Sequence, residues 1–182
     1  PRHNIPIRNK VFIMATNLRF IKSATSSSST TASISDVFSS TYDVYQVQLN
    51  WEKQTSSNVS LRLLDSGGSA ISDAEYDFAY LQTASFNTFG TYKQTGQTSF
   101  PEVFFASTTV GGGVMLYIFN PSNSSSYTFI QGQYTGYYDG AGGGGQGRKL
   151  IGVHNVTEEI TGLQLVCPSG TISATIDVYG VK

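Results

Sequence analysis

The chain has few charged residues and almost no cysteine or histidine. Of its 182 residues only 13% are Asp, Glu, Lys or Arg, and the net charge is -1. This balance gives no overall positive field, so binding of nucleic acid is not expected as the main role. The single Cys167 excludes an intrachain disulfide, and one thiol with two histidines does not suffice for a Cys/His zinc site. Stability must therefore come from packing and from contacts between subunits.

Long apolar runs are also missing. No segment approaches the roughly 20 apolar residues of a membrane-spanning helix. The short apolar run at residues 11–14 is much shorter than the apolar region of a signal peptide. We therefore expect a soluble protein that has no membrane contact and is not exported by a signal peptide.

The chain does contain enough hydrophobic residues to form a core, together with many neutral polar residues for its surface. Hydrophobic residues make up 39% and aromatic residues 13% of the sequence. With so few charges, the surface must consist largely of Ser, Thr, Asn, Gln, Gly and Tyr. Such a surface is typical of a protein that packs against neighbours. The length predicts one domain.

Hydrophobic residues alternate with polar ones in many short segments. Tyr45, Val47, Leu49 and Trp51 are separated by polar residues, which is the period of a half-buried strand. The same period, or a strand-like apolar run, occurs at residues 59–63, 76–80, 114–119, 127–138, 149–154, 160–167 and 172–179. Because no segment has an apolar stripe at helical spacing, we predict an all-β, antiparallel β-sandwich of jelly-roll type with eight to ten strands.

Two segments depart from plain alternation. Residues 114–119 are apolar at every position, which predicts a central strand covered on both faces or lying in an interface. Residues 26–31 are all Ser or Thr and are predicted to be a linker or a long loop.

The N-terminal residues 1–16 are predicted to form an extended arm preceding the sandwich domain of residues 17–182. Two prolines exclude a helix over the first ten residues. We expect this arm to lie on a neighbouring subunit or on a capsid, with docking residues Arg2, Ile5, Ile7, Arg8 and Lys10.

The motifs of catalysis and nucleotide binding are largely absent. Only His3 and His154 could serve as an imidazole base. The glycine run at residues 140–147 formally contains GxGxxG, but a strand and not a helix is predicted to follow it. A phosphate-binding loop also fails, because Leu150 stands where Ser or Thr would hold magnesium. We expect no enzymatic activity and no cofactor, and we interpret the glycine run as a mobile hairpin tip.

Acidic residues and tyrosines leave two alternatives open. Asp73, Glu75 and Asp77 alternate, which on a strand gives a solvated face and in a loop could bind calcium. Three tyrosines near the glycine run, Tyr134, Tyr137 and Tyr138, are candidates for surface recognition because exposed aromatic rings stack on sugars and anchor interfaces. They are better explained as ordinary strand residues whose hydroxyl groups point outward.

Several motifs resemble one group of known proteins. Residues 14–22 (MATNLRFIK), 36–39 (DVFS), 42–45 (YDVY), 64–68 (LDSGG), 76–80 (YDFAY), 169–172 (SGTI) and 178–180 (VYG) are similar to segments of small virion proteins of tailed phages, especially marine and cyanobacterial ones. The similarity spans most of residues 14–182. Residues 1–13 are not covered by it.

This resemblance implies a structural role in a virus particle. The expected function is that of a capsid decoration or cement subunit. We expect a homotrimer, because trimers suit three-fold capsid points. Its expected partners are the major capsid protein or other virion proteins, and its place is the capsid surface after synthesis in the host cytoplasm. The alternative is a tail, collar or fibre-tip module that binds a host glycan.

Overall fold

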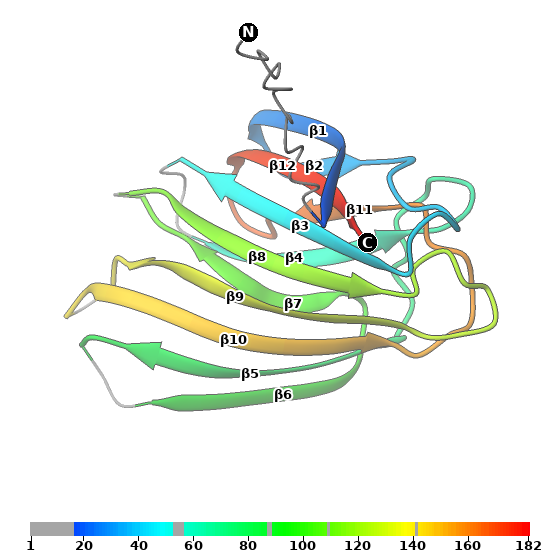
Figure 1. The fold of residues 1–182 in the computed structure, drawn as a ribbon. Coiled ribbons are helices and arrows are strands. Elements are labelled where there is room, and N and C mark those ends of the chain that lie inside the picture. Colours follow the sequence, from blue (N-terminus) through cyan, green and yellow to red (C-terminus); the bar gives the residue numbers. More distant parts are fainter. Residues whose placement is uncertain (1–16, 53–56, 87–88, 109, 141) are drawn as a thin grey trace, which may run out of the picture.

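The computed structural model describes residues 17–52, 57–86, 89–108, 110–140 and 142–182. Within these ranges the chain forms twelve β-strands and no helix (Figure 1). The strands are β1 (Leu18–Ser29), β2 (Thr31–Ile34), β3 (Val44–Trp51), β4 (Ser57–Leu64), β5 (Tyr76–Ala84), β6 (Gly90–Gln97), β7 (Phe100–Ala106), β8 (Gly112–Phe119), β9 (Thr128–Tyr138), β10 (Gly144–His154), β11 (Gly162–Val166) and β12 (Ile172–Val181). The all-β prediction is confirmed.

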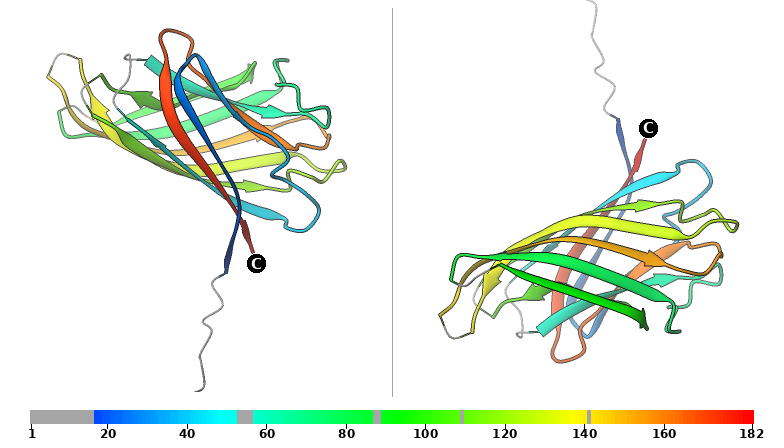
Figure 2. Two further views of the ribbon diagram at one scale, coloured as in Figure 1. Left: turned by 90° about the horizontal axis from the view of Figure 1, so that it is seen from above. Right: turned by 90° about the horizontal axis from the view of Figure 1, so that it is seen from below.

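The strands form two antiparallel sheets that pack together as a β-sandwich. The larger sheet has the order β1-β12-β3-β8-β9-β10-β5-β6, and the smaller has the order β2-β11-β4-β7. Figure 2 shows the long strands β1 and β12 running side by side at one edge of the large sheet. Strands β5 and β6 form its opposite edge. The predicted sandwich is therefore confirmed, with twelve strands over the described residues in place of eight to ten.

The alternation in the sequence determines which side chains enter the core. Tyr45, Val47, Leu49 and Trp51 are all buried, as their period of two predicts. On β12 the pattern of buried residues also alternates without interruption over its ten residues. Because each strand contributes one face to the space between the sheets, the core is a layer of side chains and not a cluster around one element.

Aromatic rings connect the two sheets. The Trp51 ring on β3 stacks on Phe104 of β7 with 4.3 Å between ring centres. Nearby, the ring of Tyr76 on β5 meets the edge of Phe100 of β7 at 4.8 Å. The buried Tyr76 hydroxyl accepts a hydrogen bond from the Leu63 amide and donates one to the Ile71 carbonyl. These contacts bury large aromatic surfaces without leaving that hydroxyl unpaired.

Two polar segments were predicted wrongly. The Ser/Thr stretch at residues 26–31 is not a loop: Ser26 and Ser29 pair with β12 within β1, and Thr31 begins β2. Strand pairing uses backbone groups, so a polar segment can belong to a sheet edge without an apolar face. The hairpin tip predicted over residues 140–147 is also shorter than expected, because Gly144 to Gly147 belong to β10 and pair with β9.

The apolar segment at residues 114–119 does form a central strand, β8, but only one of its faces is covered. Val114, Leu116 and Ile118 are buried, whereas Met115 is 44% exposed. The second face therefore points away from the small sheet. In the part of the chain that the structure describes, no helix is long and apolar enough to cross a membrane.

Candidate functional site: the outer face of the large sheet

The outward-facing side chains of the large sheet are arranged in rows across the strands. Antiparallel register places Val44, Phe119, Phe129 and Val153 next to one another on β3, β8, β9 and β10. Phe129 is 43% exposed, and the other three are half-buried. Directly opposed side chains in a sheet lie about 5 Å apart, so this row is one continuous apolar strip.

The next two rows mix apolar residues with amides. One row, Tyr117, Gln131, Ile151 and Ala79, runs from β8 to β5, and the following row is Met115, Gln133, Lys149 and Leu81. Ile151 and Leu81 are the most exposed of these apolar side chains, at 59% and 58%. Exposed apolar groups that adjoin one another, unlike single scattered ones, are typical of interaction surfaces.

The fourth row is built from small residues. Asn50, Gly113, Thr135 and Gly147 follow one another across β3, β8, β9 and β10. A Cβ added at Gly113 would lie 3.4 Å from the Asn50 Oδ1 atom, so no side chain occupies this space. Over these four rows the sheet face therefore changes from bulky apolar residues to small residues.

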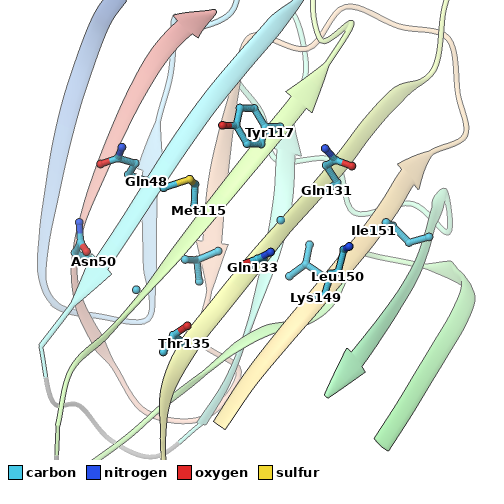
Figure 3. A pocket seen from close by; sticks show the side chains of 13 residues that line it. Gln48, Asn50, Met115, Tyr117, Gln131, Gln133, Thr135, Lys149, Leu150 and Ile151 are labelled. Atoms are coloured by element: carbon cyan, nitrogen blue, oxygen red, sulfur yellow. The ribbon is translucent and has the colours of Figure 1, made fainter. Parts of the chain in front are cut away.

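A groove of about 590 Å³ crosses the middle of this face. Figure 3 shows amide side chains from β3 and β9 standing on both sides of Met115 and Tyr117 of β8. Its lining residues are Gln48, Asn50, Gly113, Val114, Met115, Tyr117, Gln131, Gly132, Gln133, Thr135, Lys149, Leu150 and Ile151. Two further hollows, of about 540 and 480 Å³, adjoin it on the side of β5 and β6, and Ile151 lines all three.

The groove offers neutral hydrogen-bonding groups beside apolar surface. Four amide side chains can each donate and accept hydrogen bonds, and Lys149 is the only charged residue among its described lining residues. This chemistry suits a protein surface or a neutral polyhydroxyl compound. It gives little attraction for a polyanion.

The buried Gln46 shapes one wall of the face. Its Nε2 atom donates to the Met115 sulfur at 3.0 Å and to the Tyr117 hydroxyl at 3.4 Å. These contacts hold two outward-facing residues of β8 in place from the neighbouring strand β3. A preorganised side chain loses less conformational entropy when a partner binds.

The three tyrosines predicted from the sequence do not form one cluster. Tyr134 is buried at 1% exposure between the sheets and is not available for surface recognition. The Tyr138 ring stacks on Phe86 at 5.1 Å and is half-buried. Only Tyr137 of the three is exposed, on the outer face opposite Gly145. Successive strand residues point to opposite faces, which is why neighbours in sequence separate.

The other predicted site residues have different outcomes. Arg2, Ile5, Ile7, Arg8 and Lys10 all lie outside the described residues. The acidic triplet does not converge: the Asp77 carboxylate accepts a hydrogen bond from the Gly96 amide, while Glu75 faces His154.

One feature of the sequence indicated the outer face. Apolar residues at every position of 114–119 predicted either a covered strand or an interface, and the exposed Met115 now favours the interface. The rest of the face could not be found in this way, because it depends on the register between strands distant in sequence. Comparison with family models, with curated proteins and with solved structures gives no match for this chain.

Proposed function

We propose that this chain is a non-enzymatic structural subunit of a tailed-phage particle, a capsid decoration or cement protein that docks through the outer face of its large sheet. The observation that carries the docking role is the apolar strip and its neighbours Ile151, Leu81 and Met115, which stay exposed in the isolated chain. The phage assignment is supported only by the sequence motifs that resemble small virion proteins.

The dimensions of the face suit a protein partner. Eight strands spaced about 4.8 Å apart make a sheet about 34 Å wide, and four outward rows extend about 20 Å along the strands. The resulting area of roughly 700 Å² is close to the ~800 Å² that each partner contributes to a standard interface. At about 25 cal/mol per Å² of apolar area, covering even part of it gives several kcal/mol of gross driving force.

The strand order supports the jelly-roll part of the proposal. Without the hairpins β5-β6 and β9-β10, the sheets become β1-β12-β3-β8 and β2-β11-β4-β7, and the chain changes sheet at every step except from β4 to β7. A jelly roll has eight strands in two such sheets. The two hairpins then act as insertions that widen the docking sheet. The trimeric state and the major capsid protein as partner stay predictions.

The experiment uses particles of the phage that encodes this chain, produced with its gene deleted. Purified wild-type protein is added and particle-bound protein is quantified after sedimentation. Ile151→Glu should reduce binding at least tenfold, since it puts a charge at the point where all three hollows meet. Ser33→Glu adds the same charge to an exposed position of the small sheet and should bind normally. Equal binding of both variants would refute docking by this face.

A second candidate function is recognition of a host glycan by the same groove. It is favoured by the amides of Gln48, Asn50, Gln131 and Gln133, which match neutral hydroxyl groups. A glycan array probed with wild type, Gln131→Ala and Gln133→Ala tests it. Specific sugar binding that both variants lose would support an adhesion module, and an array without signal would reject it.

A further inference from the structure

Three side chains from two distant parts of the chain converge at one end of the sandwich. His154 is the last residue of β10 and pairs in register with Tyr76, the first residue of β5. Glu75 immediately precedes β5, and Glu158 lies in the connection from β10 to β11. One ligand atom from each of Glu75, His154 and Glu158 lies within 4.8 Å of the others.

The His154 ring is buried beside the Tyr76 ring. Its side chain is fully buried, and its ring centre lies 5.0 Å from that of Tyr76. A backbone hydrogen bond of 2.9 Å from the Asn155 amide to the Glu75 carbonyl joins the two segments beside it. Packing therefore encloses the imidazole, and its Nε2 atom lies near both carboxylates.

The Nε2 atom of His154 lies near two carboxylates but can donate only one hydrogen. The Nε2 atom lies 3.2 Å from the Glu75 Oε2 atom and 3.5 Å from the Glu158 Oε1 atom. An imidazole nitrogen carries at most one hydrogen, so it can satisfy one carboxylate but not both. Only the contact with Glu75 has the geometry of a hydrogen bond. Glu158 thus has only the longer ion-pair contact with the imidazole, and its carboxylate lies close to that of Glu75.

The surroundings add further negative charge. Burial is the main reason why the pKa of Glu158 is raised, and the carboxylates of Glu75, Asp65 and Asp73 raise it further, against the opposing effect of His154. A cation at the point where the three side chains meet would relieve this repulsion.

We propose that Glu75, His154 and Glu158 bind a divalent transition-metal ion, for which Zn²⁺ has the best fit. Tetrahedral zinc with bonds of about 2.0–2.1 Å places its ligand atoms about 3.4 Å apart. The two measured separations from Nε2, 3.2 and 3.5 Å, lie on either side of this value. The side chains of Glu75 and Glu158 are 27% and 32% exposed. Small rotations of these side chains can therefore bring their two carboxylate oxygens to the same spacing.

The ligand types also select among metals. Calcium and magnesium prefer all-oxygen sites, whereas an imidazole with carboxylates suits zinc and its transition-metal neighbours. A water molecule would complete the four ligands of zinc, and the partly exposed glutamates would give it access. The ion would join the start of β5 to the end of β10 and to the following connection. Its role is to fix this end of the sandwich, whatever the partner of the outer sheet face.

The test measures zinc binding by the full chain in a His3→Asn background, because His3 is the only other histidine. Zinc is titrated against a chromophoric chelator, and thermal unfolding is followed with zinc, with calcium and with EDTA. One zinc ion should bind per chain and raise the unfolding midpoint, while calcium at the same concentration should leave it unchanged.

Two matched variants decide whether the cluster is the site. Glu158→Gln should weaken zinc binding at least tenfold, whereas Glu159→Gln, an exposed neighbour, should bind as the background protein does. Circular dichroism without metal checks that both are folded. Absence of stoichiometric zinc binding, or equal affinity of the two variants, would overturn the proposal.

Discussion

The guanidinium carbon of Arg148 lies 4.3 Å from the centre of the Tyr80 ring, inside the sandwich. Arg148 is only 7% exposed, although it follows the glycine run on β10. Its Nε atom donates to the Gln82 side chain at 3.2 Å, and its Nη2 atom lies 3.7 Å from the Glu102 carboxylate. Because the charge is stacked, hydrogen-bonded and paired, it is tolerated in the core.

The first prediction concerns this buried cation. Arg148→Lys should lower the free energy of unfolding by about 2 kcal/mol, because an ammonium cannot stack on Tyr80 and bond Gln82 and Glu102 together. Guanidinium chloride unfolding measures the loss. The neighbouring, exposed Lys149→Arg should change stability by less than about 0.5 kcal/mol. Equal stability of Arg148→Lys and wild type would show that the planar guanidinium is not required.

The second prediction concerns the stacked rings between the sheets. Phe104→Ala should destabilise the protein by about 3–5 kcal/mol, since it leaves a cavity beneath Trp51 in a fully buried site. Fluorescence of Trp51, the single tryptophan, should shift to longer wavelength. Phe129→Ala removes the same ring from the exposed outer face and should cost less than about 1 kcal/mol. A smaller loss for Phe104 than for Phe129 would contradict the assignment of the two faces.

The third prediction concerns two glycines on neighbouring strands. A Cβ at Gly132 would lie 2.3 Å from the Met115 carbonyl oxygen, so Gly132→Ala should force β8 and β9 apart and cost at least about 2 kcal/mol. Gly113→Ala points into the open groove, where the nearest atom is 3.4 Å away, and should be nearly neutral. Thermal unfolding of the two variants compares them directly. Similar midpoints would be inconsistent with the register of β8 and β9.

The fourth prediction concerns ionisation of the buried tyrosines. Burial raises the pKa of Tyr134 to about 12, and it also raises the pKa values of Tyr76 and Tyr80. In the unfolded chain tyrosine ionises near pH 10. The folded state therefore holds these protons more tightly, so their stabilisation is complete below about pH 10 and declines as pH rises toward 12 and above.

Absorbance at 295 nm measures this effect. In native buffer, part of the tyrosine signal should appear only at or above about pH 12 or together with unfolding, whereas in guanidinium chloride the whole signal should appear near pH 10. Identical titration curves in both solvents would show that these hydroxyl groups are not buried.

The sequence predicted the fold where one residue in two is apolar. Tyr45 to Trp51 and the whole of β12 follow from alternation, because one face of each strand is buried. The prediction of a linker or loop at Ser26 to Thr31 was wrong, because the backbone pairing of an edge strand needs no apolar side chains. Single-residue alternation also shows why Tyr134 and Tyr137, grouped in sequence, lie on opposite faces.

The candidate sites depended on register, which alternation alone does not determine. The pairing of His154 with Tyr76 brings Glu75 to the ring, although 79 residues separate Glu75 and His154. The apolar strip of the outer face likewise combines residues of four strands. Neither arrangement leaves a local motif that sequence inspection could have found.

The most direct test of the proposed docking role is an electron cryo-microscopy reconstruction of the phage particle to which we propose that this chain belongs. We predict density for this sandwich on the particle, with Phe129, Ile151 and Leu81 buried against another virion protein. A particle in which the sandwich is present but these three residues face solvent, or from which the chain is absent, would contradict it.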